Sequence, residues 1–147
     1  MLSMENNIWN VPSVEELLEI SIANNYQNIP KSKLLEETIK ILNAIPKFYK
    51  YLIGKNFDYI ELPYILFGEI IHYIKNCLEK KGIDDVREIL EFLDKMSYSE
   101  DVDIQNLLQV WCLEAFDLHK SILPSIVLLM PENLKKNFIQ HYWSYLN

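Results

Sequence analysis

The chain has 147 residues, of which half are hydrophobic and 24% charged, and its formal net charge is −7. This length suits one compact domain, and this share of apolar and aromatic residues excludes an intrinsically disordered chain. Three glycines and six prolines are too few for an all-β fold rich in turns.

The N-terminus has neither the basic nor the apolar region of a secretory signal. The longest apolar run, "ILPSIVLLM", is interrupted by Pro124 and is far shorter than the roughly 20 residues of a membrane span. We therefore expect a cytoplasmic protein without a membrane partner. In that compartment the two cysteines, Cys77 and Cys112, are expected to be reduced and buried rather than bridged.

The charge is unevenly distributed. Residues 84–117 carry ten acids against two bases, whereas residues 31–81 carry nine lysines against six acids. The acidic segment should repel nucleic acid and attract basic partners. The alternative is a solvated acidic surface that only aids solubility.

Helical spacing begins after a first segment, residues 1–12, that could be flexible. A helix is predicted over 12–26, with a capping box of Ser13 and Glu16 and an apolar stripe of Val14, Leu17, Leu18 and Ile22. A second is predicted over 32–45, capped by Ser32. Pro46 disfavours helix at Ile45, so a break should precede a short helix that ends at Gly54.

Two longer helices follow. One is predicted over 63–82, with Pro63 in its first turn and Gly82 just past its end. The other covers 84–96, and the residues predicted to face the core are Val86, Ile89, Leu90, Leu93 and Met96.

The last predicted elements are a helix over 101–118, a short apolar element around 121–129 and a helix over 131–146. The apolar side of the final helix is predicted to consist of Leu134, Phe138, Tyr142 and Leu146. About seven helices with short connections predict a single all-α domain over 1–147, built from stacked antiparallel hairpins. Both a closed bundle and a short HEAT-like curl fit this pattern.

The helix over 101–118 is apolar on more than one side. At 100° per residue the core side contains Ile104, Leu107, Leu108, Trp111, Cys112 and Ala115. The opposite side contains Asp103, Asn106, Val110, Glu114 and Asp117, with Leu113 at the border. Either a neighbouring helix covers Val110 and Leu113, or they form an apolar contact patch with an acidic rim.

No residue pattern indicates catalysis. Glu69 and His72 have the spacing of a metal-ligand pair, but no second such pair exists and both fall on a polar face. We expect a local ion pair there, without a metal or cofactor. The cysteines lie on apolar stripes, and phosphate-loop and nucleophile-elbow motifs are absent. The stretch "KFYKYLIGK" (47–55) could stack on single-stranded nucleic acid, but a core helix with lysine at its edges is the more ordinary interpretation.

Two segments, "LPYILFGEIIHYIKNCL" (62–78) and "DVDIQNLLQVWCLEAFD" (101–117), resemble a family of small, acidic, helical bacterial proteins. Some of its members are immunity proteins of polymorphic-toxin and contact-dependent growth-inhibition systems. The resemblance implies an antitoxin role, in which the chain binds a cognate toxin domain one-to-one and blocks its active site.

The predicted function is therefore an immunity protein, not an enzyme, that neutralises a basic toxin domain, with a nuclease as the expected toxin. A helical adaptor or regulatory module with another basic or peptide partner is the alternative. The wheel and the charge count place the partner surface at Glu88, Glu91, Asp94, Glu100, Asp101, Asp103, Asn106, Val110, Glu114 and Asp117.

Overall fold

The computed structural model describes residues 11–23, 30–55 and 63–142. These residues are mostly helical and contain no β-strand, which confirms the all-α fold class. The chain divides into two compact units, Met1–Pro63 and Tyr64–Asn147. The single domain stays a prediction, and most of the segment expected to be flexible, residues 1–10, lies outside the described residues.

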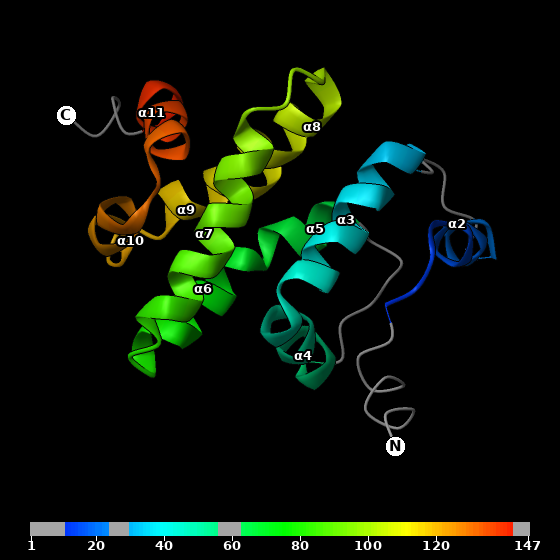
Figure 1. Cartoon of the computed structure of the whole chain (residues 1–147), viewed down its shortest axis with the longest axis horizontal. Helices are drawn as coiled ribbons and strands as arrows, with labels where there is room; N and C mark the ends of the chain where they lie inside the picture. The colour runs from blue at the N-terminus through cyan, green and yellow to red at the C-terminus, as the bar shows by residue number, and fades with distance from the viewer. Residues whose placement is uncertain (1–10, 24–29, 56–62, 143–147) are drawn as a thin grey trace. The chain divides into compact units, whose positions relative to one another are not determined.

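Unit 1 contains α2 (Val14–Ala23), α3 (Ser32–Ala44) and α4 (Pro46–Gly54), drawn from blue to teal in Figure 1. The predicted capping box is present. The backbone N–H of Ser13 donates to Glu16 Oε1, and the N–H of Glu16 donates to Ser13 Oγ, both at 3.1 Å. The break before Pro46 is also confirmed, because Ile45 leaves the helical conformation with φ −123° and ψ 76°.

Two details of unit 1 differ from the prediction. Ser32 does not cap α3; the residue at that position is Lys31, which makes no side-chain capping hydrogen bond. Ile22 is exposed rather than part of the apolar stripe of α2, where the buried residues are Leu17 and Ser21. The predicted end of this first helix, residues 24–26, lies outside the described residues.

Unit 2 begins with α5 (Tyr64–Gly68), α6 (Ile70–Glu79) and α7 (Ile83–Ser97). The single helix predicted over 63–82 is therefore interrupted, at Glu69. Gly68 lies where α5 packs against a later helix, and a Cβ atom at this position would stand 3.5 Å from the carbonyl oxygen of Trp111, an ordinary van der Waals distance. The inward residues predicted for α7 are all buried, which confirms its core face.

The turn between α6 and α7 uses a lysine where the sequence suggested a glycine. Lys81 has a positive φ of 59°, and Gly82, with φ −87°, precedes α7. The N–H of Gly82 donates to the carbonyl of Cys77 at 2.7 Å and the N–H of Lys81 to that of Leu78 at 3.1 Å. This pattern is a Schellman motif, in which Lys81 occupies the left-handed position.

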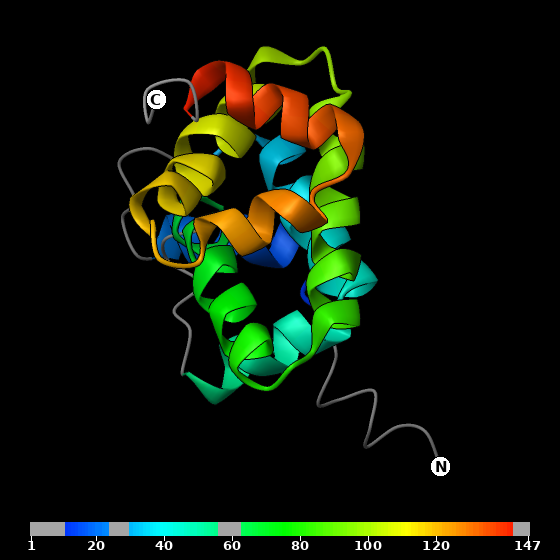
Figure 2. The ribbon, with the colours of Figure 1, turned by 90° about the vertical axis from the view of Figure 1, so that its left-hand side faces the viewer.

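The rest of unit 2 is α8 (Val102–Asn106), η2 (Leu107–Leu113), α9 (Glu114–Leu118), α10 (Leu123–Leu129) and α11 (Glu132–His141). Figure 2 shows α7 along one side of this unit and η2 with α9 along the other, with α10 and α11 running between them. The core between these helices includes Leu90, Leu93, Leu108, Cys112, Phe116, Ile126, Leu134 and Phe138.

Candidate partner-binding surface

The helix predicted over 101–118 contains a π-helical segment, η2, between two short α-helices. In a π-helix each N–H bonds to the fifth preceding carbonyl rather than the fourth, so each turn holds more residues. A wheel drawn at 100° per residue therefore misplaces the side chains that follow. Leu113 is completely buried, and Trp111, expected in the core, is 39% exposed.

Val110 lies on the solvent side of η2 and is 42% exposed. Asn106 and Glu114, one turn before and one turn after it, are exposed as well. We call these three residues the η2 face. Val110 and Leu113, which the sequence left as either covered or in contact with a partner, thus have different positions, because Leu113 belongs to the core and Val110 to the surface.

The π-helical turn of η2 is held by hydrogen bonds with Asn137 of α11 and with Tyr142, the residue that follows α11. The hydroxyl of Tyr142 donates to the carbonyl oxygen of Gln109 at 2.5 Å, and Gln109 Nε2 donates to Asn137 Oδ1 at 3.1 Å. Burial raises the pKa of the Tyr142 hydroxyl, and the carboxylates of Glu114 and Asp117 raise it further. The tyrosine therefore stays a neutral donor. No helical pattern singles out these residues, because their partners are about 30 positions away.

Two of the acids predicted to bind a partner are engaged within the protein. Asp101 Oδ1 accepts from the N–H groups of Asp103 and Ile104, at 2.9 and 3.2 Å, and so caps α8. Asp94 Oδ1 accepts from the N–H of Leu134 at 2.8 Å, at the start of α11. These carboxylates stabilise helix termini, and they are poor candidates for partner contact.

The turn between α7 and α8 is fixed by another long side chain. Gln105 Nε2 donates to the carbonyl oxygens of Ser97 and Ser99, at 3.0 and 2.6 Å. The hydroxyl of Ser97 also accepts from Asn133 Nδ2 at 2.8 Å. This clamp positions the exposed Glu100 at the end of the unit.

The predicted surface is not one continuous face. Glu88 and Glu91 are exposed on the side of α7 opposite its buried residues, and the η2 face is exposed opposite the buried residues of η2. Both helices pack toward the same core from different sides (Figure 2), so these two exposed faces point away from each other. The exposed acids of α7 and the η2 face are therefore two separate candidate surfaces of unit 2.

Asp117 is only partly exposed, and its Oδ1 is buried without a hydrogen-bond partner among the described residues. Asp103 is likewise partly exposed. The exposed members of the predicted set are Glu88, Glu91, Glu100, Asn106, Val110 and Glu114.

Glu69 and His72 form the expected local pair, with Glu69 Oε2 3.9 Å from His72 Nε2. The ring of His72 packs edge-on against that of His119, with centroids 5.2 Å apart. Within the residues that the structure describes, no three His, Cys, Asp or Glu side chains are arranged to hold a metal ion. The absence of a metal stays a prediction.

Cys77 and Cys112 do not bridge each other, and both are buried. Cys112 lies in the core of unit 2, where burial raises the pKa of its thiol far above the ordinary value. A protonated thiol is a poor nucleophile, so the setting of Cys112 does not suit covalent catalysis.

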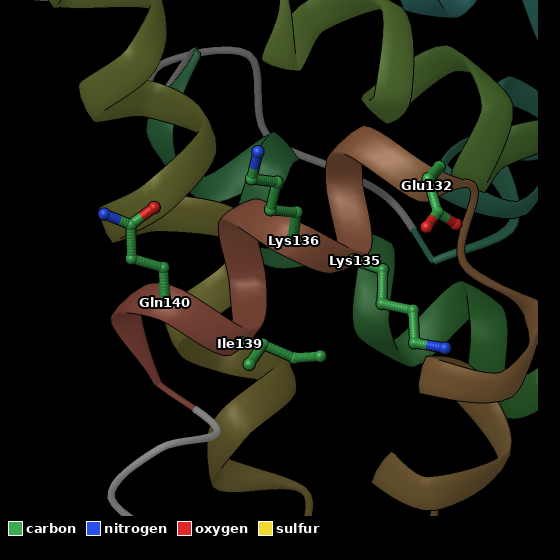
Figure 3. Close-up of a pocket in the computed structure, with 5 residues that line it drawn as sticks. All are labelled: Glu132, Lys135, Lys136, Ile139 and Gln140. Atoms are coloured by element: carbon green, nitrogen blue, oxygen red, sulfur yellow. The ribbon is translucent and has the colours of Figure 1, made fainter.

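A hollow on unit 2 is lined by Glu132, Lys135, Lys136, Ile139 and Gln140, all from α11. Figure 3 shows these side chains spreading outward from the helix rather than converging on one point. A single helix does not enclose a small molecule, so this hollow is not a candidate active site. In unit 1 the stretch 47–55 lies in α4 except for Lys55, and this helix buries Phe48, Tyr49 and Leu52 and leaves Lys47 and Lys50 exposed.

Residues 38–144 match the model of a family described as a domain of unknown function, DUF7674. The chain belongs to this family. The matched range covers most of α3, all of α4 and nearly all of unit 2, so the family's sequence pattern is not confined to one unit. No curated protein and no solved structure matches the chain. No helix among the described residues is long and apolar enough to cross a membrane.

Proposed function

We propose that this member of the DUF7674 family is an immunity protein that binds a basic toxin domain one-to-one and blocks its active site. The single observation that carries the proposal is the η2 face, where exposed Val110 lies between Asn106 and Glu114. An apolar centre with polar and acidic neighbours is the usual composition of a transient protein-binding surface.

The charge of the chain supports the same partner class. A nuclease must carry positive charge to hold phosphates, and a protein that occludes its site is favoured by negative charge. Residues 84–117 supply this charge with ten acids against two bases. The described residues offer no group of His, Cys, Asp or Glu side chains that could hold a catalytic metal ion. In this proposal the protein acts in the cytoplasm, where an incoming nuclease meets its substrate.

The two acidic faces of unit 2 allow the binding side to be located. The test co-expresses this chain with a toxin domain encoded by a neighbouring gene and measures survival and association rate. One variant carries Asn106→Lys and Glu114→Lys on the η2 face, and a second carries Glu88→Lys and Glu91→Lys on α7. A third carries Glu15→Lys and Glu36→Lys in unit 1, at exposed positions.

We expect the η2 variant alone to lose protection, because the two introduced lysines slow association with a basic partner and repel it at contact. Association of the native chain should be faster at low salt, since exposed charges are screened over about 10 Å at 0.1 M ionic strength. Loss of protection only in the α7 or unit 1 variant would move the surface elsewhere. If the native chain binds no neighbouring basic domain but captures another protein partner, the adaptor function replaces this proposal.

A further inference from the structure

We propose that the aromatic pair of Tyr64 and Trp111 forms the centre of the partner surface and takes an arginine side chain from the basic partner. This inference rests on the proposed function, and it names the chemistry that the same surface recognises. The two rings come from different helices, α5 and η2, and their centroids are 4.9 Å apart at an interplanar angle of 44°.

The pair remains accessible to a partner. Trp111 is 39% exposed and Tyr64 is half-buried. Their chain neighbours Val110 and Ile65 are exposed to a similar extent, at 42% and 41%. Four large apolar or aromatic side chains therefore reach solvent where α5 packs against η2. Exposed tryptophan and tyrosine are the residue types that most often dominate the energy of a protein interface.

The rings are held in place before any partner arrives. The backbone of α5 at Gly68 packs near the carbonyl of Trp111, and Tyr142 and Asn137 fix Gln109 two positions earlier. These contacts restrict the wide turn that carries Trp111. A surface whose side chains are already ordered loses less conformational entropy on binding.

The chemistry of the site selects a cation. The faces of Trp and Tyr rings attract a guanidinium or ammonium group through the ring quadrupole. No described Lys or Arg lies over either ring of this pair, and Glu114, three residues after Trp111, makes no ion pair with a described residue. An arginine can stack flat on a ring and also direct its planar N–H groups to a carboxylate, which a lysine cannot do as well.

A nucleic-acid base also stacks on aromatic rings, but the charge of this surface favours an arginine side chain over a base. Unit 2 carries thirteen Asp and Glu against eight Lys and Arg, and Glu114 is exposed near the pair. A phosphate backbone would meet repulsion at this surface, whereas a basic protein segment would be attracted.

The test measures the dissociation constant of the complex between the full chain and the toxin domain encoded next to it. Trp111→Ala should weaken binding at least about 30-fold, the size of effect expected for an interface hot spot. Trp111→Leu keeps apolar bulk but removes the aromatic face, and it should also lose most of the affinity. The matched control is Tyr98→Ala, which removes an exposed aromatic ring from the turn between α7 and α8. Its effect should be less than about 3-fold.

Circular dichroism and thermal unfolding establish whether each variant is folded. If Trp111→Ala is not folded, the binding of Trp111→Leu alone tests the proposal.

If the complex tolerates both Trp111 substitutions, or depends on Tyr98 instead, the Tyr64–Trp111 pair is not the centre of the partner surface, and the proposed function is unaffected. Full binding by Trp111→Leu with loss by Trp111→Ala shows an apolar contact and overturns the arginine assignment. Failure of the native chain to bind any neighbouring basic domain overturns both proposals. Tight binding of single-stranded oligonucleotide that is lost in Trp111→Leu overturns the arginine partner in favour of a base.

Discussion

The carboxylate of Asp94 on α7 accepts a hydrogen bond of 2.8 Å from the backbone N–H of Leu134 on α11. The residue before α11 is Pro131, whose side chain has no acceptor and makes no capping bond. Asp94 therefore caps a helix that lies 40 positions away in the sequence. This acid ties two helices of the core together, and its main role is structural.

Asp94→Ala should lower the free energy of unfolding by about 1–2 kcal/mol, because it leaves the Leu134 N–H without its acceptor. Urea denaturation followed by circular dichroism measures this change. The control is Glu91→Ala, one turn earlier and exposed, which should change stability by less than about 0.5 kcal/mol. Equal effects of the two substitutions would contradict the capping role.

Lys81→Gly should stabilise the protein by about 0.5–1 kcal/mol. Lys81 holds a φ of 59°, a conformation that costs free energy for residues with a Cβ atom and that glycine adopts readily. The neighbouring residue provides a matched control, since Lys80 has a φ of −94°. Lys80→Gly should be neutral or destabilising, because glycine only adds freedom to the unfolded chain there. Thermal unfolding of both variants checks the prediction, which fails if Lys81→Gly melts at a lower temperature than the native chain.

The thiol of Cys112 should make stability depend on pH in the mildly alkaline range. Its pKa is raised in the folded protein, so its stabilising contribution is fully present below the unfolded thiol pKa of about 8.5. Above that pH the unfolded chain loses the proton and the folded protein keeps it, so stability falls by up to about 1.4 kcal/mol per pH unit.

Free energies of unfolding measured between pH 7.5 and 9.5 test this dependence. Cys112→Ala serves as the reference, because it removes the thiol and leaves the other titrating groups in place. The variant should be less stable at neutral pH, since it leaves a small cavity, but its stability should fall less steeply with pH. Parallel pH curves for the two proteins would argue against a buried thiol.

Purified protein should contain no stoichiometric metal. Glu69 and His72 are a pair at 3.9 Å without a third ligand among the described residues, and two ligands seldom hold a metal ion. Elemental analysis after dialysis measures the content. One iron, zinc or manganese per chain, lost in a His72→Gln variant, would show that the pair belongs to a metal site.

The parts of the fold with strong local signals could be predicted from sequence. Pro46 and Gly54 delimit α4, and the apolar period of α7 identified its buried residues. The interruption at Glu69 has no comparable local signal. The α6–α7 turn was misread by one position, since Lys81 and not the adjacent Gly82 has the left-handed conformation.

The candidate surface was predictable only in part. The exposed position of Val110 and Glu114 agrees with the wheel, but Trp111 and Leu113 are displaced because the period changes within η2. Nothing in the local sequence distinguishes Asp94, which caps a distant helix, from the free acid Glu91. The separation of the α7 face from the η2 face depends on how the helices surround the core, which no single-helix pattern describes (Figure 2).

The wide turn of η2 also determines where this chain can change length. A π-helical turn holds one residue more than the α-helical turn that would replace it. Deletion of a residue within 107–113 would restore α-helical spacing while leaving α9 in its register against the core. The same deletion within α7 would rotate Ile89, Leu90 and Leu93 out of the core. Insertions and deletions among related chains should therefore concentrate in η2, and each would bring a different side chain to the position of Trp111.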